Sequence, residues 1–92
     1  MQITVKLYGD LRMKAPNKNN LYGMPNTLTI KLEGIKTIFD ILNKFNISIR
    51  EISHIFLNGV YSNVQKEVKE GDRIGIFPRR MGLIFEEIKS PF

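Results

Sequence analysis

The stretch that decides the fold reads Glu70-Gly71-Asp72-Arg73-Ile74-Gly75-Ile76-Phe77-Pro78. Its first three residues favour a tight turn, because glycine accepts a positive φ and aspartate bonds to nearby backbone amides. Ile74 and Ile76 then alternate with other residues, which is the period of a strand with one buried face. Pro78 has no amide hydrogen and ends the ladder. The stretch therefore predicts a short core strand between a turn and a proline.

Composition limits the class of protein. The chain has 92 residues, 42% hydrophobic and 25% charged, so we expect one soluble domain. It has no cysteine, which excludes disulfides, zinc–thiolate sites, iron–sulfur clusters and a cysteine nucleophile. No apolar run approaches the roughly 20 residues that span a bilayer, and we expect a cytoplasmic location. The net charge of +5 is mildly basic and fits solvated surface lysines.

Two strands are expected near the N-terminus. Apolar residues alternate with polar ones in residues 3–7 and again in residues 28–32, the pattern of half-buried strands. Between them, residues 9–26 are rich in Asn, Pro and Gly, so we expect a long mobile loop. The two strands would form a wide antiparallel hairpin.

A helix is expected to begin after Thr37. This residue can cap the first turn, and Asp40 completes a variant of the capping box. Four apolar residues at helical spacing form a stripe that would face the sheet, namely Ile38, Ile41, Leu42 and Phe45. Asn46 is the expected stop, since asparagine accepts the left-handed conformation that commonly ends helices.

A hairpin should follow the helix. Residues 54–57 have strand character, and Asn58-Gly59 is a strong signal for a two-residue hairpin turn. Ile47, Ile49 and Ile52 are expected to be buried in the connection from the helix. The resulting order, β-β-α-β-β-β, is typical of an α+β fold.

Three segments together resemble the ubiquitin-like sulfur carriers, the family of the molybdopterin synthase small subunit and the thiamine sulfur carrier. They are Tyr8-Gly9-Asp10-Leu11-Arg12, Ile55-Phe56-Leu57-Asn58-Gly59 and Gly71 to Pro78. The resemblance covers residues 2–82 and implies an α+β, ubiquitin-like β-grasp domain, a mixed sheet crossed by one main helix. The domain would span residues 1–82, and residues 83–92 would be a C-terminal extension.

The resemblance also implies where a carrier would hold its cargo. Those carriers end in a glycine pair whose carboxylate is adenylated, and the tail must lack side chains to enter a narrow channel. Aligned from Phe77-Pro78, that pair falls on Gly82 and Leu83, so one glycine is kept and further residues follow. We expect the chain as encoded not to be adenylated. A working carrier would need C-terminal processing.

Three aromatic residues, Tyr8, Phe56 and Phe77, lie on the strand phase opposite to the core. We expect them to form one exposed patch, and the resemblance implies that this sheet face binds a protein partner. Alternatively, the C-terminal extension covers the patch. Arg79 and Arg80, at the strand exit, are either contacts to an acidic or phosphorylated partner or ordinary surface residues.

The sequence offers no catalytic or metal site. His54 is the one histidine, and we expect it to be a hydrogen-bonded structural residue. The acidic residues show no paired spacing for acid–base catalysis, and no glycine spacing fits a phosphate-binding loop. We therefore expect neither an enzyme nor a cofactor.

The extension includes Leu83-Ile84-Phe85-Glu86-Glu87-Ile88, which is too apolar for a free disordered tail. We expect residues 83–88 to be ordered, folded back over the sheet or paired with a second chain. A homodimer is favoured, because a short apolar segment is a template for another chain.

Three hypotheses about function follow. The first is a non-catalytic interaction module that keeps the docking face of the carriers without their glycine pair. The second is a working sulfur carrier for molybdopterin or thiamine biosynthesis after processing. The third is a weak nucleic-acid-binding domain that uses Lys14, Lys18, Arg79 and Arg80.

Overall fold

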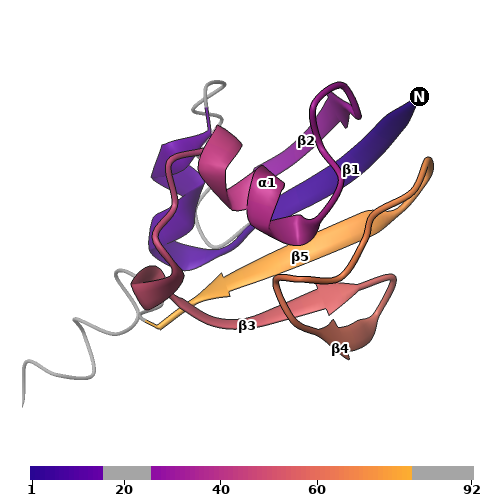
Figure 1. The fold of residues 1–92 in the computed structure, drawn as a ribbon. Helices are drawn as coiled ribbons and strands as arrows, with labels where there is room; N and C mark the ends of the chain where they lie inside the picture. Colours follow the sequence, from indigo (N-terminus) through magenta and orange to yellow (C-terminus); the bar gives the residue numbers. More distant parts are fainter. Residues whose placement is uncertain (16–25, 80–92) are drawn as a thin grey trace, which may run out of the picture.

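The computed structural model describes residues 1–15 and 26–79. These form a five-stranded sheet with the helix α1 lying across one face (Figure 1). The elements in chain order are β1 (Gln2–Leu7), the 3₁₀ helix η1 (Gly9–Lys14), β2 (Asn26–Lys31), α1 (Ile38–Lys44), the 3₁₀ helix η2 (Ile49–Glu51), β3 (Ile52–Leu57), β4 (Val60–Ser62) and β5 (Arg73–Pro78). No helix in the described ranges is long and apolar enough to span a membrane.

The sheet is mixed, with strand order β2-β1-β5-β3-β4. β1 and β2 form the predicted antiparallel hairpin, while β1 and β5 pair in parallel. β3 is antiparallel to both β5 and β4. β5, which contains Ile74 and Ile76, is therefore the central strand, with β1 on one side and β3 on the other.

One core fills the space between α1 and the sheet. The predicted stripe of α1 is buried, with Ile38, Ile41 and Leu42 fully inaccessible and Phe45 nearly so. Opposite it lie the alternate apolar residues of three strands, Ile3, Val5, Leu7, Ile55, Ile74 and Ile76. Amphipathic periodicity thus assigned the inward face of the helix and of the strands correctly.

The ends of α1 follow the predicted chemistry. The Asp40 carboxylate accepts hydrogen bonds from the backbone N–H of Lys36 at 2.8 Å and of Thr37 at 3.1 Å. These bonds, that from Lys36 first, lower the pKa of Asp40 because they stabilise its charged form. Asn46 has a φ of 58°, the left-handed conformation expected after the helix.

Two expectations about connections are wrong. Residues 9–14 are not a mobile loop: they form η1, which buries Leu11 against the core. Ile49 is 51% exposed, since the short helix η2 turns it outward while Ile47 and Ile52 are buried as expected. The remainder of the predicted loop, residues 16–25, and the extension, residues 83–92, lie outside the described residues.

Candidate interaction surface

The face of the sheet away from α1, here called the outer face, carries the candidate site. Strand alternation that points apolar residues into the core points their neighbours outward. The register places Gly75 of β5 between Lys6 of β1 and Phe56 of β3, and Phe56 beside Tyr61 of β4. One row across the outer face thus joins four strands.

Five rings on the outer face form one contact group, which we call the aromatic cluster. Its members are Tyr8, His54, Phe56, Tyr61 and Phe77. Tyr8 and Phe77 stack with ring centroids 4.0 Å apart and planes 10° apart. Phe56 meets Phe77 edge-on with ring centroids 5.5 Å apart, and it meets Tyr61 in a tilted arrangement with centroids 4.9 Å apart. The edge-to-face contact of Phe56 with Phe77 is one of the favourable geometries for aromatic pairs.

The predicted aromatic patch therefore forms, although its three rings are half-buried because they cover one another. His54 was expected to be a hydrogen-bonded structural residue. It instead lies within the cluster, 5.5 Å from the rings of both Phe77 and Tyr61. Tyr61 keeps 65% of its surface exposed and forms the open edge of the group.

A hollow of about 290 Å³ opens beside the cluster. It is lined by Lys6, Tyr8, Phe56, Gly59, Arg73, Ile74, Gly75 and Phe77. Gly75 forms its floor: a Cβ there would lie 3.5 Å from Tyr8 Cε1 and 3.7 Å from Phe77 Cε1, in ordinary contact. Because Gly75 has no side chain, the hollow stays open above its backbone, beside the rings of Tyr8 and Phe77.

The charged side chains that line the hollow are positive. Lys6 and Arg73, both exposed, lie on its walls, and no acidic residue lines it within the described ranges. The combination of aromatic surface and two cations suits an apolar group next to a carboxylate.

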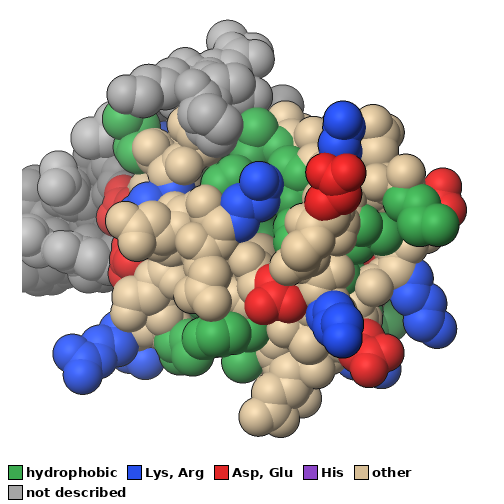
Figure 2. Space-filling model, turned by 45° about the horizontal axis from the view of Figure 1, so that its top comes forward, with side chains coloured by type: hydrophobic (Ala, Val, Ile, Leu, Met, Phe, Trp, Pro, Cys, Tyr) green, Lys and Arg blue, Asp and Glu red, His purple; other side chains and the backbone are tan. Residues whose placement is uncertain are grey.

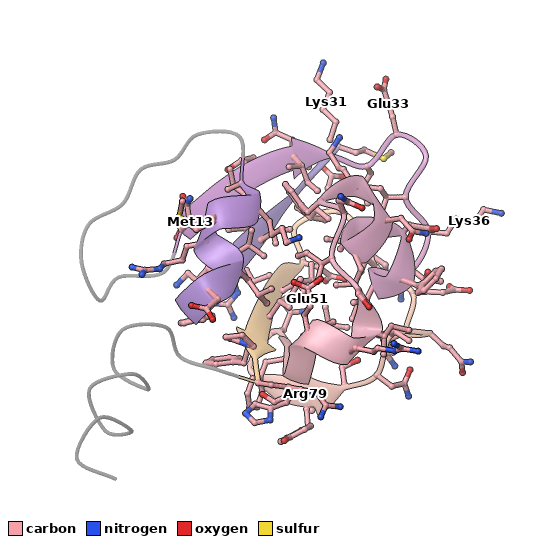
Figure 3. All side chains as sticks on the ribbon, turned by 90° about the vertical axis from the view of Figure 1, so that its left-hand side faces the viewer. Met13, Lys31, Glu33, Lys36, Glu51 and Arg79 are labelled. Carbon is pink, nitrogen blue, oxygen red and sulfur yellow. The ribbon has the colours of Figure 1, made fainter. Side chains whose placement is uncertain are left out.

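The other predicted contacts are placed separately. Arg79 is exposed after β5, and its backbone N–H donates to the Glu51 carbonyl at 3.0 Å. Figure 3 shows Arg79 at the opposite end of the molecule from Lys31 and Glu33. Arg80, Gly82 and Leu83 lie outside the described residues, so their predicted roles stay predictions.

Two of the cations proposed for nucleic acid, Lys14 and Arg79, lie within the described residues. Lys14 lies on η1, where its Nζ contacts Glu51 Oε1 at 3.7 Å and donates to the Asn46 carbonyl at 3.2 Å. Lys18 falls outside the described residues. On the face seen in Figure 2, positive and negative side chains are interspersed rather than separated by sign.

Sequence reasoning missed His54, Tyr61 and Gly75 as members of the site. Tyr61 could have been found, because a two-residue turn at Asn58-Gly59 pairs Phe56 with Tyr61. Gly75 carried no such signal. Its role depends on two neighbouring strands bringing rings to either side of it.

Comparisons with known proteins agree with this architecture. A family model described as Mut7-C ubiquitin matches residues 1–83. The crystal structure of SAMP1 from Haloferax volcanii is similar, with a TM-score of 0.58, 17% identity, and coverage of 85% of this chain and 94% of that chain. No curated protein matches. These comparisons confirm the prediction of a ubiquitin-like chain with an α+β β-grasp fold.

Proposed function

This chain belongs to the Mut7-C ubiquitin family, and from that premise we propose that it is a non-catalytic interaction module that binds a protein partner through the aromatic cluster. The observation that carries the proposal is an assembled group of five rings on a sheet face that no described element covers. Contiguous aromatic surface of this kind is typical of interaction sites.

The energetics favour a docking role over a purely structural one. The rings are already held by stacking and strand pairing, so a partner that covers them loses little side-chain entropy. Tyr61 offers a hydroxyl beside an apolar ring face, a combination that is frequent in the centres of interfaces. Arg79 and Arg80 would then contact the partner at the rim of the interface. The proposed setting is the cytoplasm.

The working carrier is the alternative. It would use Gly82 and Leu83 rather than the outer face alone, and it requires processing of the C-terminus. The segment 83–88 is a further proposed contact, either with its own sheet or with a second copy. We favour the interaction module because the outer face needs no such processing.

Site-specific photo-cross-linking tests the proposal. A benzophenone amino acid replaces Phe56 in one variant and Phe39, which lies on α1 and is 40% exposed, in the control. In the native cell, Phe56 should cross-link to a defined protein and Phe39 should not. Cross-linking of Phe56 to RNA would replace the proposal with the nucleic-acid hypothesis.

Binding of the purified partner then completes the test. Tyr61→Ala should weaken binding on the order of tenfold or more, because tyrosine side chains that a partner covers are often the residues on which binding depends. Tyr61 is exposed, so the fold should survive the change. Phe39→Ala is the matched control and should bind as the natural protein does. Equal affinities for all three proteins would contradict the proposal.

A further inference from the structure

The hollow at Gly75 specifies the chemistry of its occupant. A large apolar side chain can rest over Gly75 against the rings of Tyr8, Phe56 and Phe77, because these residues line the hollow and Gly75 projects no side chain into it. Lys6 and Arg73 stand on the walls and attract a carboxylate that follows the apolar group. The fitting ligand is thus an extended peptide that combines large apolar residues with acids.

The chain itself carries one segment of that composition. Residues 83–88 read Leu83-Ile84-Phe85-Glu86-Glu87-Ile88, four large apolar residues around two adjacent glutamates. Apolar surface would meet the aromatic cluster, and the negative pair would meet the two cations of the hollow. The apolar residues and the glutamates of the segment therefore each have a complementary group on the outer face.

The exit of the chain from the sheet makes this contact reachable. The backbone of Arg79 is tied to Glu51, so the chain leaves β5 at the η2 end, beside Phe77 and His54. Four residue steps from Arg79 to Leu83 span at most about 14 Å, enough to reverse over the nearest rings. The distance along β5 from Phe77 to Arg73 is also four residue steps, or about 13 Å. An extended segment from Leu83 to Glu87 has the same length.

We infer that residues 83–88 bind the outer face of their own chain, with the apolar side chains on the aromatic cluster and the glutamates at Lys6 and Arg73. The inference rests on the proposed function, since it treats this face as a docking site. The segment then competes with the protein partner for the same face. A partner that binds there must displace the segment and present the same chemistry, an apolar group next to carboxylates.

Paramagnetic broadening in the full-length chain tests the contact. The chain has no cysteine, so Ser90→Cys provides a unique site for a nitroxide two residues beyond the segment. Amide resonances of Lys6, Phe56 and Gly75 should lose most of their intensity and recover when the nitroxide is reduced. Amides of α1 on the opposite face should keep theirs. Retention of intensity on the outer face would overturn the inference.

Two further measurements separate the possible outcomes. The first mixes spin-labelled Ser90→Cys chain, which carries no isotope label, with isotope-labelled natural chain, which has no cysteine and carries no nitroxide. Broadening in this mixture can come only from contacts between copies, and it would overturn the intramolecular contact in favour of a dimer. Replacing Glu86→Lys and Glu87→Lys together should abolish the broadening, and adding Lys6→Glu and Arg73→Glu should restore it. Failure of this inference leaves the cross-linking at Phe56 unaffected, so it is distinguishable from failure of the proposed function.

Discussion

Single polar side chains hold the chain reversals of this fold in place. Asn58, with a φ of 52°, donates from Nδ2 to Asp72 Oδ1 at 3.0 Å and accepts the Arg73 N–H at 2.8 Å. Asp72 also accepts the Lys69 N–H at 2.7 Å. The β3–β4 hairpin turn is thereby fastened to the turn that begins β5. The sequence predicted each turn, whereas the bonds between the two become apparent only once β3 and β5 pair.

Asn58→Gly should therefore destabilise the fold. Glycine adopts the positive φ easily, so the change isolates the lost side-chain hydrogen bonds, which together are worth about 1–3 kcal/mol. Urea unfolding measures the difference. Asn46→Gly is the matched control, because Asn46 also has a positive φ, 58°, and its side chain joins no hydrogen bond within the described ranges. Equal effects of the two substitutions would rule out the proposed link between the turns.

The lowered pKa of Asp40 predicts a pH-dependent contribution to stability. A carboxyl whose folded-state pKa is below its unfolded value stabilises the fold above the unfolded pKa, about 3.9, and loses that contribution as pH falls through the folded pKa. Asp40→Asn should be less stable than the natural protein at pH 7, and the gap should close in strong acid. Urea unfolding across this pH range measures it. If the difference in unfolding free energy between the two proteins stayed constant with pH, the negative charge of Asp40 would have no part in capping the helix.

Whole elements were predictable where they are long enough to show a period. The strands β1, β2 and β5 and the helix α1 were recovered from alternation and from a four-residue stripe. η1 and η2 were not, because one or two turns of 3₁₀ helix are too short to show a period and their residues also favour loops. Ile49 illustrates the difficulty, since its apolar side chain suggested burial and the turn exposes it.

The stripe of α1 gives a direct test of helix–sheet packing. Ile41 is fully buried, so Ile41→Ala should leave a cavity and cost about 2–5 kcal/mol of unfolding free energy. Phe39→Ala, two positions away on the same helix, should cost much less because 40% of Phe39 is exposed. Thermal or urea unfolding compares the two. A larger cost for Phe39 would mean that the helix packs on a different face.

The domain as a whole explains why the site was only partly predictable. Tyr8, Phe56 and Phe77 could be assigned to the outer face from strand phase alone, since their neighbours are core residues. The cluster, however, joins β3, β4 and β5 with Tyr8, which directly follows β1, and the order β2-β1-β5-β3-β4 decides which rings meet. That order puts Gly75 between Lys6 and Phe56, residues far from it in sequence. The periodicity of the sequence predicts which face of the sheet a side chain occupies, whereas its neighbours on that face depend on the strand order.

The last feature of the whole molecule is the contrast between its β-grasp fold and its C-terminal sequence. The described residues contain the five strands and the helix of the β-grasp fold, whereas the carriers that the sequence resembles end in a glycine pair that is not present at Gly82 and Leu83. Incubated with ATP and an adenylating enzyme of ubiquitin-like carriers, the full-length chain should release no pyrophosphate above background, because the side chains after Gly82 cannot enter a narrow channel.

A chain with Leu83→Gly that stops at that position restores the glycine pair and serves as the matched comparison. If the scaffold still docks such an enzyme, this variant should release pyrophosphate while the full-length chain does not. The difference would assign the loss of transfer chemistry to the tail alone. Release by the full-length chain would instead favour the carrier over the interaction module, because adenylation of an unprocessed chain needs no glycine pair at its end.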